Sequence, residues 1–246
     1  MSKNFELMTR IEKGDFFKLP AEAAPLPQRA RAAIPLKKVP PDPEIAKLVQ
    51  RLFSPVTNGS GPKKVVSFSG ISRDDRSSWI CARAGEILAE QAATSVCMVE
   101  ANFHSPQLHV QFATTNQIGL ADALTTDGPI RNFGKSIGGE NLWLIPSGLV
   151  KPGFYPSMER FGERLAELRE AFEYVLLSAP AFSRETEATF LGQLADGLVL
   201  IVEANQSRRE TVRRVKEQLE GAHVRLLGAV LDQRTFPIPE ALYRRL

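Results

Sequence analysis

The stretch that decides the fold is residues 65–79, VVSFSGISRDDRSSW, in which a strand pattern passes through a polar loop into a helix pattern. Residues 65–69 form a short β-branched and aromatic run, which is typical of a buried strand. Residues 77–92 carry apolar side chains at helical spacing. In open α/β sheets, ligands bind outside the carboxyl ends of the strands, so this loop is the first place to look for a site.

Strand patterns and helix patterns alternate through the rest of the chain. Strands are predicted at 95–99, 142–145, 174–177, 198–202 and 224–231, and helices at 157–172, 185–194 and 208–220. Such alternation is typical of a parallel sheet that is covered by helices on both faces. Right-handed crossovers then give a doubly wound, three-layer α/β/α domain, and this is the predicted fold class.

Composition excludes several classes of protein. The 246 residues are 43% hydrophobic, so the chain buries a sizeable core. The net charge of +3 neither supports nor excludes binding to nucleic acid. Cys81 and Cys97 lack the spacing of metal ligands, which favours a reducing compartment over a disulfide framework. No apolar run approaches the roughly 18 residues of a membrane-spanning helix. We therefore expect a cytoplasmic protein.

The chain divides into three parts. Residues 1–62 are a proline-rich extension with one predicted helix near 43–53. Residues 63–235 form the α/β domain. Residues 236–246 are a C-terminal tail of apolar and basic residues, which either docks on a membrane-protein partner or packs back on the domain.

Three strand ends are candidate sites. The first loop has no later glycine and no lysine, and Asp74 and Asp75 would repel a polyanion, although Arg73 and Arg76 offset part of that charge. From these residues alone, we favour an ordinary polar loop that is capped by Ser77 or Asp75.

The other two strand ends carry single polar groups. Glu100 suits a metal-bound water, although an exposed surface carboxylate is the commoner case at such a position. His104 is expected to make a polar contact rather than to bind a metal. Ser178 offers a hydroxyl but no carboxylate for Mg²⁺.

Taken together, residues 41–246 resemble the cytoplasmic domain of bacterial tyrosine autokinases of polysaccharide synthesis, which are deviant Walker P-loop ATPases. The family's first loop resembles Thr-Ser-x-x-Pro-Gly-Glu-Gly-Lys-Ser-Thr, and only Ser78 matches its functional positions. Its second motif, Asp-x-Asp, aligns with Glu100 and Asn102. Its Walker B strand, Phe-Asp-Tyr-Val-Ile-Ile-Asp, aligns with residues 172–178 and places Ser178 at the aspartate.

The resemblance implies a P-loop NTPase-like fold whose nucleotide site is degenerate. Catalysis is not expected, because Glu100, Asn102 and Ser178 replace the family's aspartates. No cofactor or metal is expected either; the alternative is ATP with Mg²⁺ held at Ser78 and Glu100. The remnant of the nucleotide site comprises Arg73, Asp74, Asp75, Arg76, Ser77, Ser78 and Asp232. A loose version of the family's oligomerisation helix comprises Glu44, Lys47, Gln50 and Arg51, and a plain solvated helix face is the equal alternative.

Three functions follow from the resemblance. The first is a binding or regulatory subunit in exopolysaccharide or capsule synthesis and export, whose partner is a membrane polysaccharide copolymerase or a kinase of the family, and which lies at the inner membrane through that partner. The second is an active ATP-dependent tyrosine autokinase, and the third is a partition-type ATPase. Glutamates interleave the basic residues at 208–216, so no nucleic-acid partner is expected.

Overall fold

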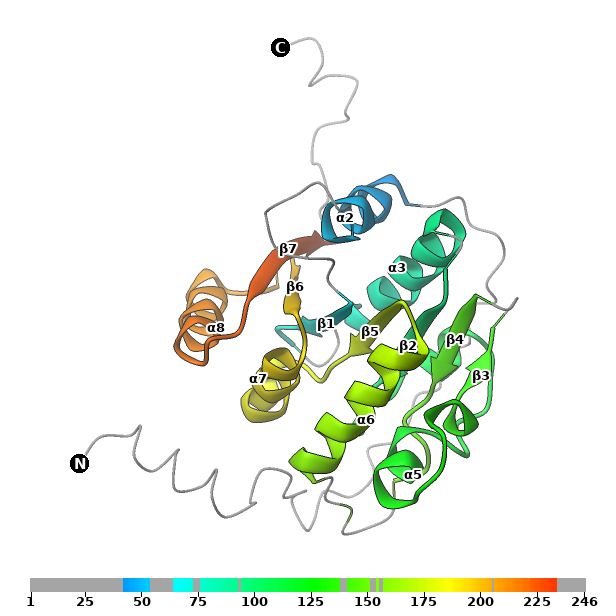
Figure 1. The fold of residues 1–246 in the computed structure, drawn as a ribbon. Coiled ribbons are helices and arrows are strands. Elements are labelled where there is room, and N and C mark those ends of the chain that lie inside the picture. Colours follow the sequence, from blue (N-terminus) through cyan, green and yellow to red (C-terminus); the bar gives the residue numbers. More distant parts are fainter. Residues whose placement is uncertain are drawn as a thin grey trace, which may run out of the picture.

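The computed structural model describes residues 42–53, 64–72, 76–92, 94–137, 141–150, 154, 157–204 and 206–233. Its centre is a seven-stranded sheet in the order β3-β4-β2-β5-β1-β6-β7 (Figure 1). Neighbouring strands are parallel except for β3 and β4, which are antiparallel. The strands are β1 (Val65–Gly70), β2 (Val96–Glu100), β3 (Lys135–Ser136), β4 (Leu142–Ile145), β5 (Tyr174–Ser178), β6 (Gly197–Glu203) and β7 (Leu226–Asp232).

Helices cover both faces of this sheet. Helices α2 (Pro43–Phe53) and α3 (Ser77–Ala92) lie over one face, and α6 (Met158–Ala171), α7 (Glu185–Leu194) and α8 (Arg209–Gly221) lie over the other. The shorter α4 (Leu108–Gln111), α5 (Leu120–Thr125), η2 (Ile130–Phe133) and η3 (Phe182–Arg184) belong to the connections. The predicted three-layer α/β/α fold is confirmed.

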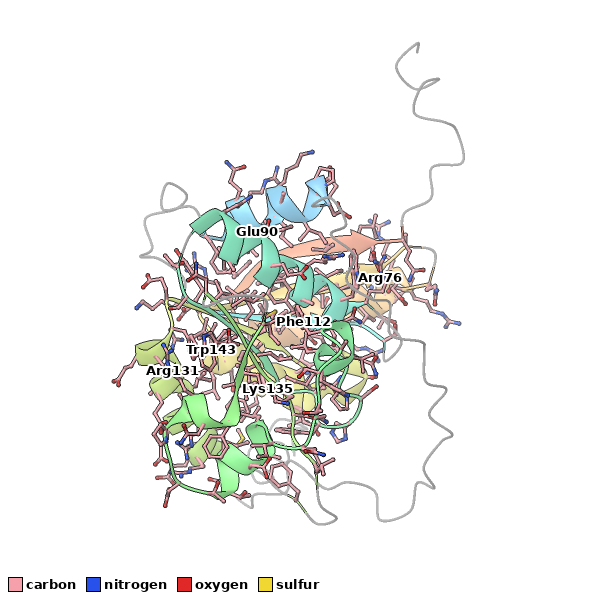
Figure 2. The ribbon with its side chains drawn as sticks, turned by 90° about the vertical axis from the view of Figure 1, so that its right-hand side faces the viewer. Arg76, Glu90, Phe112, Arg131, Lys135 and Trp143 are labelled. Carbon is pink, nitrogen blue, oxygen red and sulfur yellow. The ribbon has the colours of Figure 1, made fainter. Side chains whose placement is uncertain are left out.

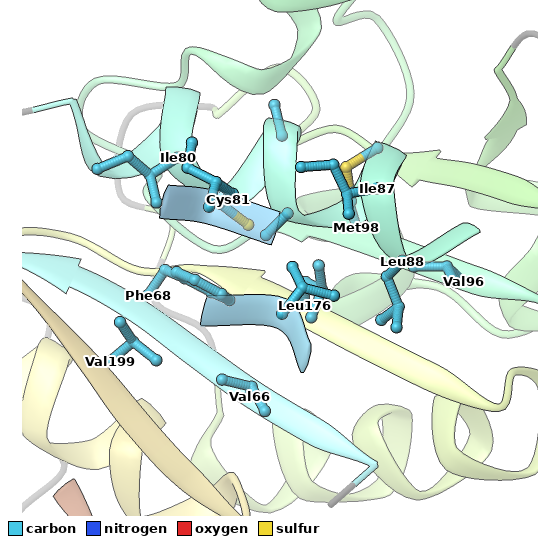
Figure 3. Packing of buried hydrophobic residues seen from close by; sticks show 14 of the residues in the cluster. Val66, Phe68, Ile80, Cys81, Ile87, Leu88, Val96, Met98, Leu176 and Val199 are labelled. Carbon is cyan, nitrogen blue, oxygen red and sulfur yellow. The ribbon is translucent and has the colours of Figure 1, made fainter. Parts of the chain in front are cut away.

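Alternating side chains of the buried strands supply the two halves of the core. In β1, Val66 and Phe68 pack toward α2 and α3, whereas Val65 packs on the α6 side. Figure 3 shows Val66, Phe68 and Leu176 of the sheet facing Ile80 and Cys81 of α3. All six residues of β1 are buried, which is the burial expected of a central parallel strand.

The predicted elements agree with the structure to within two residues at each end. The spans 43–53, 77–92, 142–145 and 185–194 coincide with α2, α3, β4 and α7. The short strand β3 and the short helices between residues 108 and 133 had no predicted counterpart, because each is too brief to show a period in the sequence.

The amino ends of β1 and β6 are held together by one carboxylate. Asp196 Oδ2 accepts hydrogen bonds from the backbone N–H groups of Lys64 (2.7 Å) and Val65 (2.8 Å). Arg169 of α6 donates to both oxygens of the same carboxylate, at 3.0 and 2.7 Å. Burial alone would raise the pKa of Asp196, but the Arg169 guanidinium and the two N–H groups lower it below its ordinary value. The carboxylate is therefore ionised and fixes the start of the central strand.

Gly119, just before α5, makes a close backbone approach. A methyl group at this position would lie 2.1 Å from the carbonyl oxygen of Pro146 and 2.4 Å from the backbone nitrogen of Gly148. The approach allows Leu120 N–H to donate to Pro146 O at 2.7 Å. Glycine is required here by space, and the loop after β4 is fixed against α5.

Candidate functional site

Two buried hydroxyls meet at the carboxyl end of the central strands. Ser78 lies in the first turn of α3, and Ser178 is the last residue of β5. Their Oγ atoms are 2.9 Å apart, which is a hydrogen bond, and both residues are buried. The structure thus brings together the Mg²⁺-hydroxyl position and the Walker B position that the sequence alignment identified.

Glu100 is the third member of this cluster, and it corrects the expectation of an exposed surface carboxylate. Glu100 ends β2 opposite Ser178 of β5, and it is fully buried. Its Oε2 accepts hydrogen bonds from the backbone N–H groups of Gln107 and Leu108, both at 2.7 Å, and its Oε1 accepts from Asn102 N–H at 3.3 Å. The carboxylate therefore closes the loop that follows β2 and anchors the start of α4.

Burial dominates the electrostatics of Glu100. It raises the pKa of this carboxyl from its ordinary value of 4.5 to about 7, although the N–H groups of Leu108 and Gln107 and a hydrogen bond with the Ser178 side chain lower it. The Ser178 hydroxyl has one proton, so when it donates to Glu100 it accepts from Ser78. Ser78, Ser178 and Glu100 then form one directed hydrogen-bond chain.

Cys81 adjoins this cluster from α3, one turn after Ser78. Burial raises the pKa of the Cys81 thiol well above its ordinary value, and the nearby Glu100 carboxylate raises it further. Cys81 is fully buried and is therefore an inert core residue rather than a nucleophile.

The loop after β2 is fixed at a second place. Asn102 Oδ1 accepts from the backbone N–H groups of His104 (3.3 Å) and Ser105 (3.2 Å), so Asn102 organises the turn. His104 Nε2 lies 2.8 and 2.9 Å from the carboxylate oxygens of Glu187 on α7, and both side chains are largely buried. The expectation of a polar contact for His104 is confirmed. Glu187 had no signal in the sequence beyond its place in a predicted helix.

Arg76, just before α3, and Asp232, the last residue of β7, form an ion pair. Nη1 of Arg76, which Figure 2 labels, lies 3.2 Å from Asp232 Oδ1 at the end of β7. The guanidinium carbon of Arg76 also lies 3.8 Å from the centre of the Trp79 ring. The other oxygen, Asp232 Oδ2, is buried without a hydrogen-bond partner among the described residues. The guanidinium of Arg76 is thus held by Asp232 and Trp79.

A shallow groove lies beside the start of this loop. Its volume is about 380 Å³, and it lies at the carboxyl ends of β1 and β6. It is lined by Ile71, Ser72, Ser183, Gln206, Ser207, Arg208 and Thr211. Ser72 Oγ also donates to Glu203 Oε2 at 3.1 Å, which ties the floor of the groove to β6.

The remaining predicted residues are placed as follows. Ser77 is the first residue of α3. Arg73, Asp74, Asp75 and the tail at 236–246 lie outside the described residues. Glu44, Lys47, Gln50 and Arg51 all lie on the exposed face of α2, where Lys47 and Glu44 form an ion pair at 2.8 Å. The opposite face of α2 packs into the core through Ile45, Val49, Leu52 and Phe53.

The residues present do not fit ATP with Mg²⁺. P-loop NTPases hold Mg²⁺ between the P-loop Ser/Thr and a Walker B aspartate, and a lysine binds the β- and γ-phosphates. Here the Walker B position is Ser178, and its hydroxyl bonds directly to Ser78. Glu100, the nearest carboxylate, is occupied by three backbone N–H groups. The loop from residue 69 to 79 contains no lysine.

Comparison with known proteins confirms the resemblance to bacterial tyrosine kinases. The tyrosine-protein kinase YwqD of Bacillus subtilis is 24% identical over 148 residues, which cover 59% of this chain and 62% of the relative. The tyrosine-protein kinase CpsD of Streptococcus agalactiae is 23% identical over 146 residues, which cover 58% of this chain and 64% of the relative. The chain thus matches less than two thirds of the length of these relatives. No protein-family model matches the chain.

Solved structures share the fold. The chimerical protein CapA2B2 superposes with a TM-score of 0.72 at 20% identity, covering 81% of this chain and 87% of that one. The VpsO kinase domain gives 0.68 at 18% identity, covering 78% and 94%. The septum site-determining protein MinD of Pyrococcus horikoshii, solved with Mg-ADP, gives 0.58 at 18% identity, covering 74% and 76%. The chain therefore shares the fold of these proteins.

Within the described residues, no helix is both long enough and apolar enough to cross a membrane.

Proposed function

We propose that this chain is a catalytically degenerate relative of the bacterial tyrosine kinases, which acts as a binding or regulatory subunit in exopolysaccharide or capsule synthesis and export. The observation that carries the proposal is the direct 2.9 Å hydrogen bond between Ser78 and Ser178. In a working enzyme of this fold, the Walker B carboxylate and the P-loop hydroxyl serve Mg²⁺ rather than one another. In this chain neither hydroxyl supplies the negative charge that the cation requires.

The substitutions act together on one reaction. Phosphoryl transfer depends on positioning and on electrostatic stabilisation, and one missing stabilising group typically costs about 10²–10³ in rate. Here the phosphate-binding lysine and the Walker B aspartate are both replaced, by Ser77 and Ser178. The apolar residues of the central strands, in contrast, are buried in this chain. An intact fold without the phosphate-binding groups supports a role in binding rather than in catalysis.

The proposed partner is a membrane polysaccharide copolymerase or a catalytically complete kinase of the same family. The chain lies in the cytoplasm, at the inner membrane through that partner. The curated relatives are named tyrosine-protein kinases, and this supports a partner of the kinase family. Self-association through α2 is suggested by the exposure of Glu44, Lys47, Gln50 and Arg51 on this helix.

Calorimetry with ATP and ADP, with and without Mg²⁺, tests the degenerate site in the full chain. No heat at millimolar nucleotide is the expected result. Mg²⁺-dependent binding that disappears in Ser78→Ala would place a working site at α3 and would favour the active autokinase instead. Binding that persists in Ser78→Ala would place nucleotide elsewhere, and the proposal for this site would stand.

A phosphorylation assay tests the alternative function directly. The chain contains three tyrosines, at positions 155, 174 and 243. After incubation with ATP and Mg²⁺, mass spectrometry is expected to find none of them phosphorylated. Phosphotyrosine that is absent from Ser78→Ala would overturn the proposal.

Sedimentation velocity tests the α2 face. Replacing Glu44, Lys47, Gln50 and Arg51 with alanine leaves the buried face of α2 intact. If α2 mediates self-association, the variant is expected to sediment at a lower mass than the native chain. Equal masses would show that this surface is an ordinary solvated helix face.

A further inference from the structure

The chain leaves the strands β1 and β6 toward opposite faces of the sheet. These two strands are parallel neighbours. The chain passes from β1 into α3 over one face and from β6 into α8 over the other (Figure 1). Neighbouring strands with such connections form a topological switch point, and open α/β sheets bind ligands outside the carboxyl ends of these strands. The switch point of this sheet therefore lies beside Gly70 and Glu203, where β1 and β6 end.

The groove of about 380 Å³ lies at this switch point. Its lining comes from three segments, which are residues 71–72 directly after β1, Ser183 of η3, and four residues within 206–211, around the start of α8. Pockets that hold small molecules have volumes of roughly 300–1,000 Å³, so the groove has room for one small ligand. It shares no lining residue with the buried hydroxyl cluster at the start of α3.

A buried glutamate holds two of the lining hydroxyls in place. Glu203 ends β6 and is 3% exposed. Its Oε2 accepts a hydrogen bond from Ser72 Oγ at 3.1 Å, and its backbone N–H donates to Ser207 Oγ at 3.1 Å. Ser72 Oγ therefore keeps its lone pairs for a ligand, and Ser207 Oγ keeps its proton. The groove thus offers one positioned acceptor and one positioned donor.

The other polar side chains of the groove are unpaired. The side chains of Ser183, Gln206, Arg208 and Thr211 form no hydrogen bond or ion pair with any described residue. Arg208 is the only charged residue of the lining, and none of the described lining residues is acidic. Several hydroxyls and one guanidinium around a single groove suit a ligand with hydroxyl groups and one negative charge.

The lining disfavours other classes of ligand. None of the described lining residues is aromatic, so a nucleotide base would find no ring on which to stack. Ile71 is the one aliphatic side chain of the lining and is 8% exposed, so a lipid or an apolar peptide would bury little surface here. A small polar ring with an anionic substituent matches the groups that remain.

We propose that this groove binds a monosaccharide that carries one anionic group, either a phosphate or a carboxylate. Arg208 pairs with the anionic group, and the hydroxyls of Ser72, Ser207 and Thr211 bond to the hydroxyls of the sugar. Ile71 contacts the C–H face of the sugar ring. The site is independent of the proposed function, because it uses none of the residues of the degenerate nucleotide site.

Calorimetry on the full chain tests the class of ligand with four probes, which are glucose-6-phosphate, glucuronate, glucose and inorganic phosphate. The better of the two charged sugars is expected to bind at least about tenfold more tightly than glucose and than inorganic phosphate. Glucose-6-phosphate as the tighter ligand would assign a phosphate to the site, and glucuronate would assign a carboxylate. No binding of either charged sugar at millimolar concentration, or a smaller preference over inorganic phosphate, would overturn the proposal.

A matched pair of variants tests the place of binding. Arg208→Gln removes the guanidinium that lines the groove, and the variant is expected to bind the charged sugar at least about tenfold more weakly. Arg209→Gln is the control, because Arg209 is also exposed and carries the same charge but does not line the groove. Equal losses in the two variants would reveal an effect of net charge alone and would refute the site.

The hydroxyls and the apolar wall are tested separately from the charge. Thr211→Val removes one hydroxyl with little change in shape, and it is expected to weaken the charged sugar by about fivefold. In the native chain, the methyl resonances of Ile71 are expected to shift when the charged sugar binds. Unchanged affinity in Thr211→Val together with unshifted Ile71 methyl resonances would place the ligand elsewhere and would refute the proposal.

Discussion

Replacement of Glu100 by glutamine tests the description of the buried cluster quantitatively. Burial raises the pKa of this carboxyl from 4.5 to about 7 in the folded protein. Because one pKa unit corresponds to about 1.4 kcal/mol, ionised Glu100 disfavours folding by about 3 kcal/mol relative to the protonated form. Glutamine has nearly the same shape and stays neutral, so the variant lacks this pH-dependent contribution.

The direction of the effect follows from proton binding. Between 4.5 and about 7, the folded state keeps the proton on Glu100 and the unfolded state has lost it. Stability that derives from this group is therefore fully present below 4.5 and is lost as the pH rises to about 7. The unfolding free energy of the native chain, relative to that of Glu100→Gln, is expected to fall by about 3 kcal/mol from about pH 4 to about pH 8.

Urea denaturation at several pH values provides the measurement. Subtracting the two curves cancels other titrating groups, such as His109, whose pKa is lowered by burial. Glu90→Gln, at an exposed position of α3, is the matched control and is expected to follow the native chain. The quantity to compare is the unfolding free energy of the native chain minus that of Glu100→Gln. If this difference stays constant or rises with pH, the reasoning is refuted, because the N–H donors would then balance or outweigh the effect of burial.

Three further predictions concern other parts of the molecule. Ser78→Ala and Ser178→Ala are expected to show a coupling of about 1 kcal/mol in a double-mutant cycle by urea denaturation, and zero coupling would contradict their hydrogen bond. Gly119→Ala is expected to lower the unfolding free energy by more than about 2 kcal/mol because its methyl group meets backbone atoms. Gly162→Ala, in α6, is expected to raise the unfolding free energy by about 1 kcal/mol, because the added methyl group meets no atom within 4 Å. Equal changes in unfolding free energy at the two glycines would contradict this structure. Asp196→Asn is expected to remove stability that the native carboxylate contributes above its ordinary pKa of 3.8 and loses as the pH falls below that value. Thermal melts at several pH values provide the measurement. Melting temperatures that fall equally with acid in both proteins would contradict this prediction.

Much of the fold was predictable because its determinants are local and periodic. The strands β1, β2, β5 and β6 are buried on both faces, so they read as continuous apolar runs in the sequence. Helix boundaries were predictable to within two residues from apolar spacing. The strand β3 was not predictable, because it has two residues and its pairing with β4 depends on tertiary contact.

The candidate site was predictable in location but not in its contacts. Alignment with the kinase motifs identified Ser78, Glu100 and Ser178, which lie together in the structure. No sequence pattern indicates that Glu100 is buried under the following loop, because its three N–H donors lie two to eight residues away and follow no regular spacing. The pairs Arg76–Asp232 and His104–Glu187 join residues 156 and 83 positions apart, and single-sequence patterns carry no such information.

The position of Ser178 beside Glu100 limits which mutational paths are open to this site. A single change of Ser178 to aspartate would set a second carboxylate against a buried one, and like charges at such a distance oppose ionisation of both. A change at Ser77 to lysine would bring a cation to a buried helix start without a phosphate to bind. Each step toward the kinase motif is unfavourable until the others are in place. The site is therefore expected to resist single substitutions toward the kinase motif.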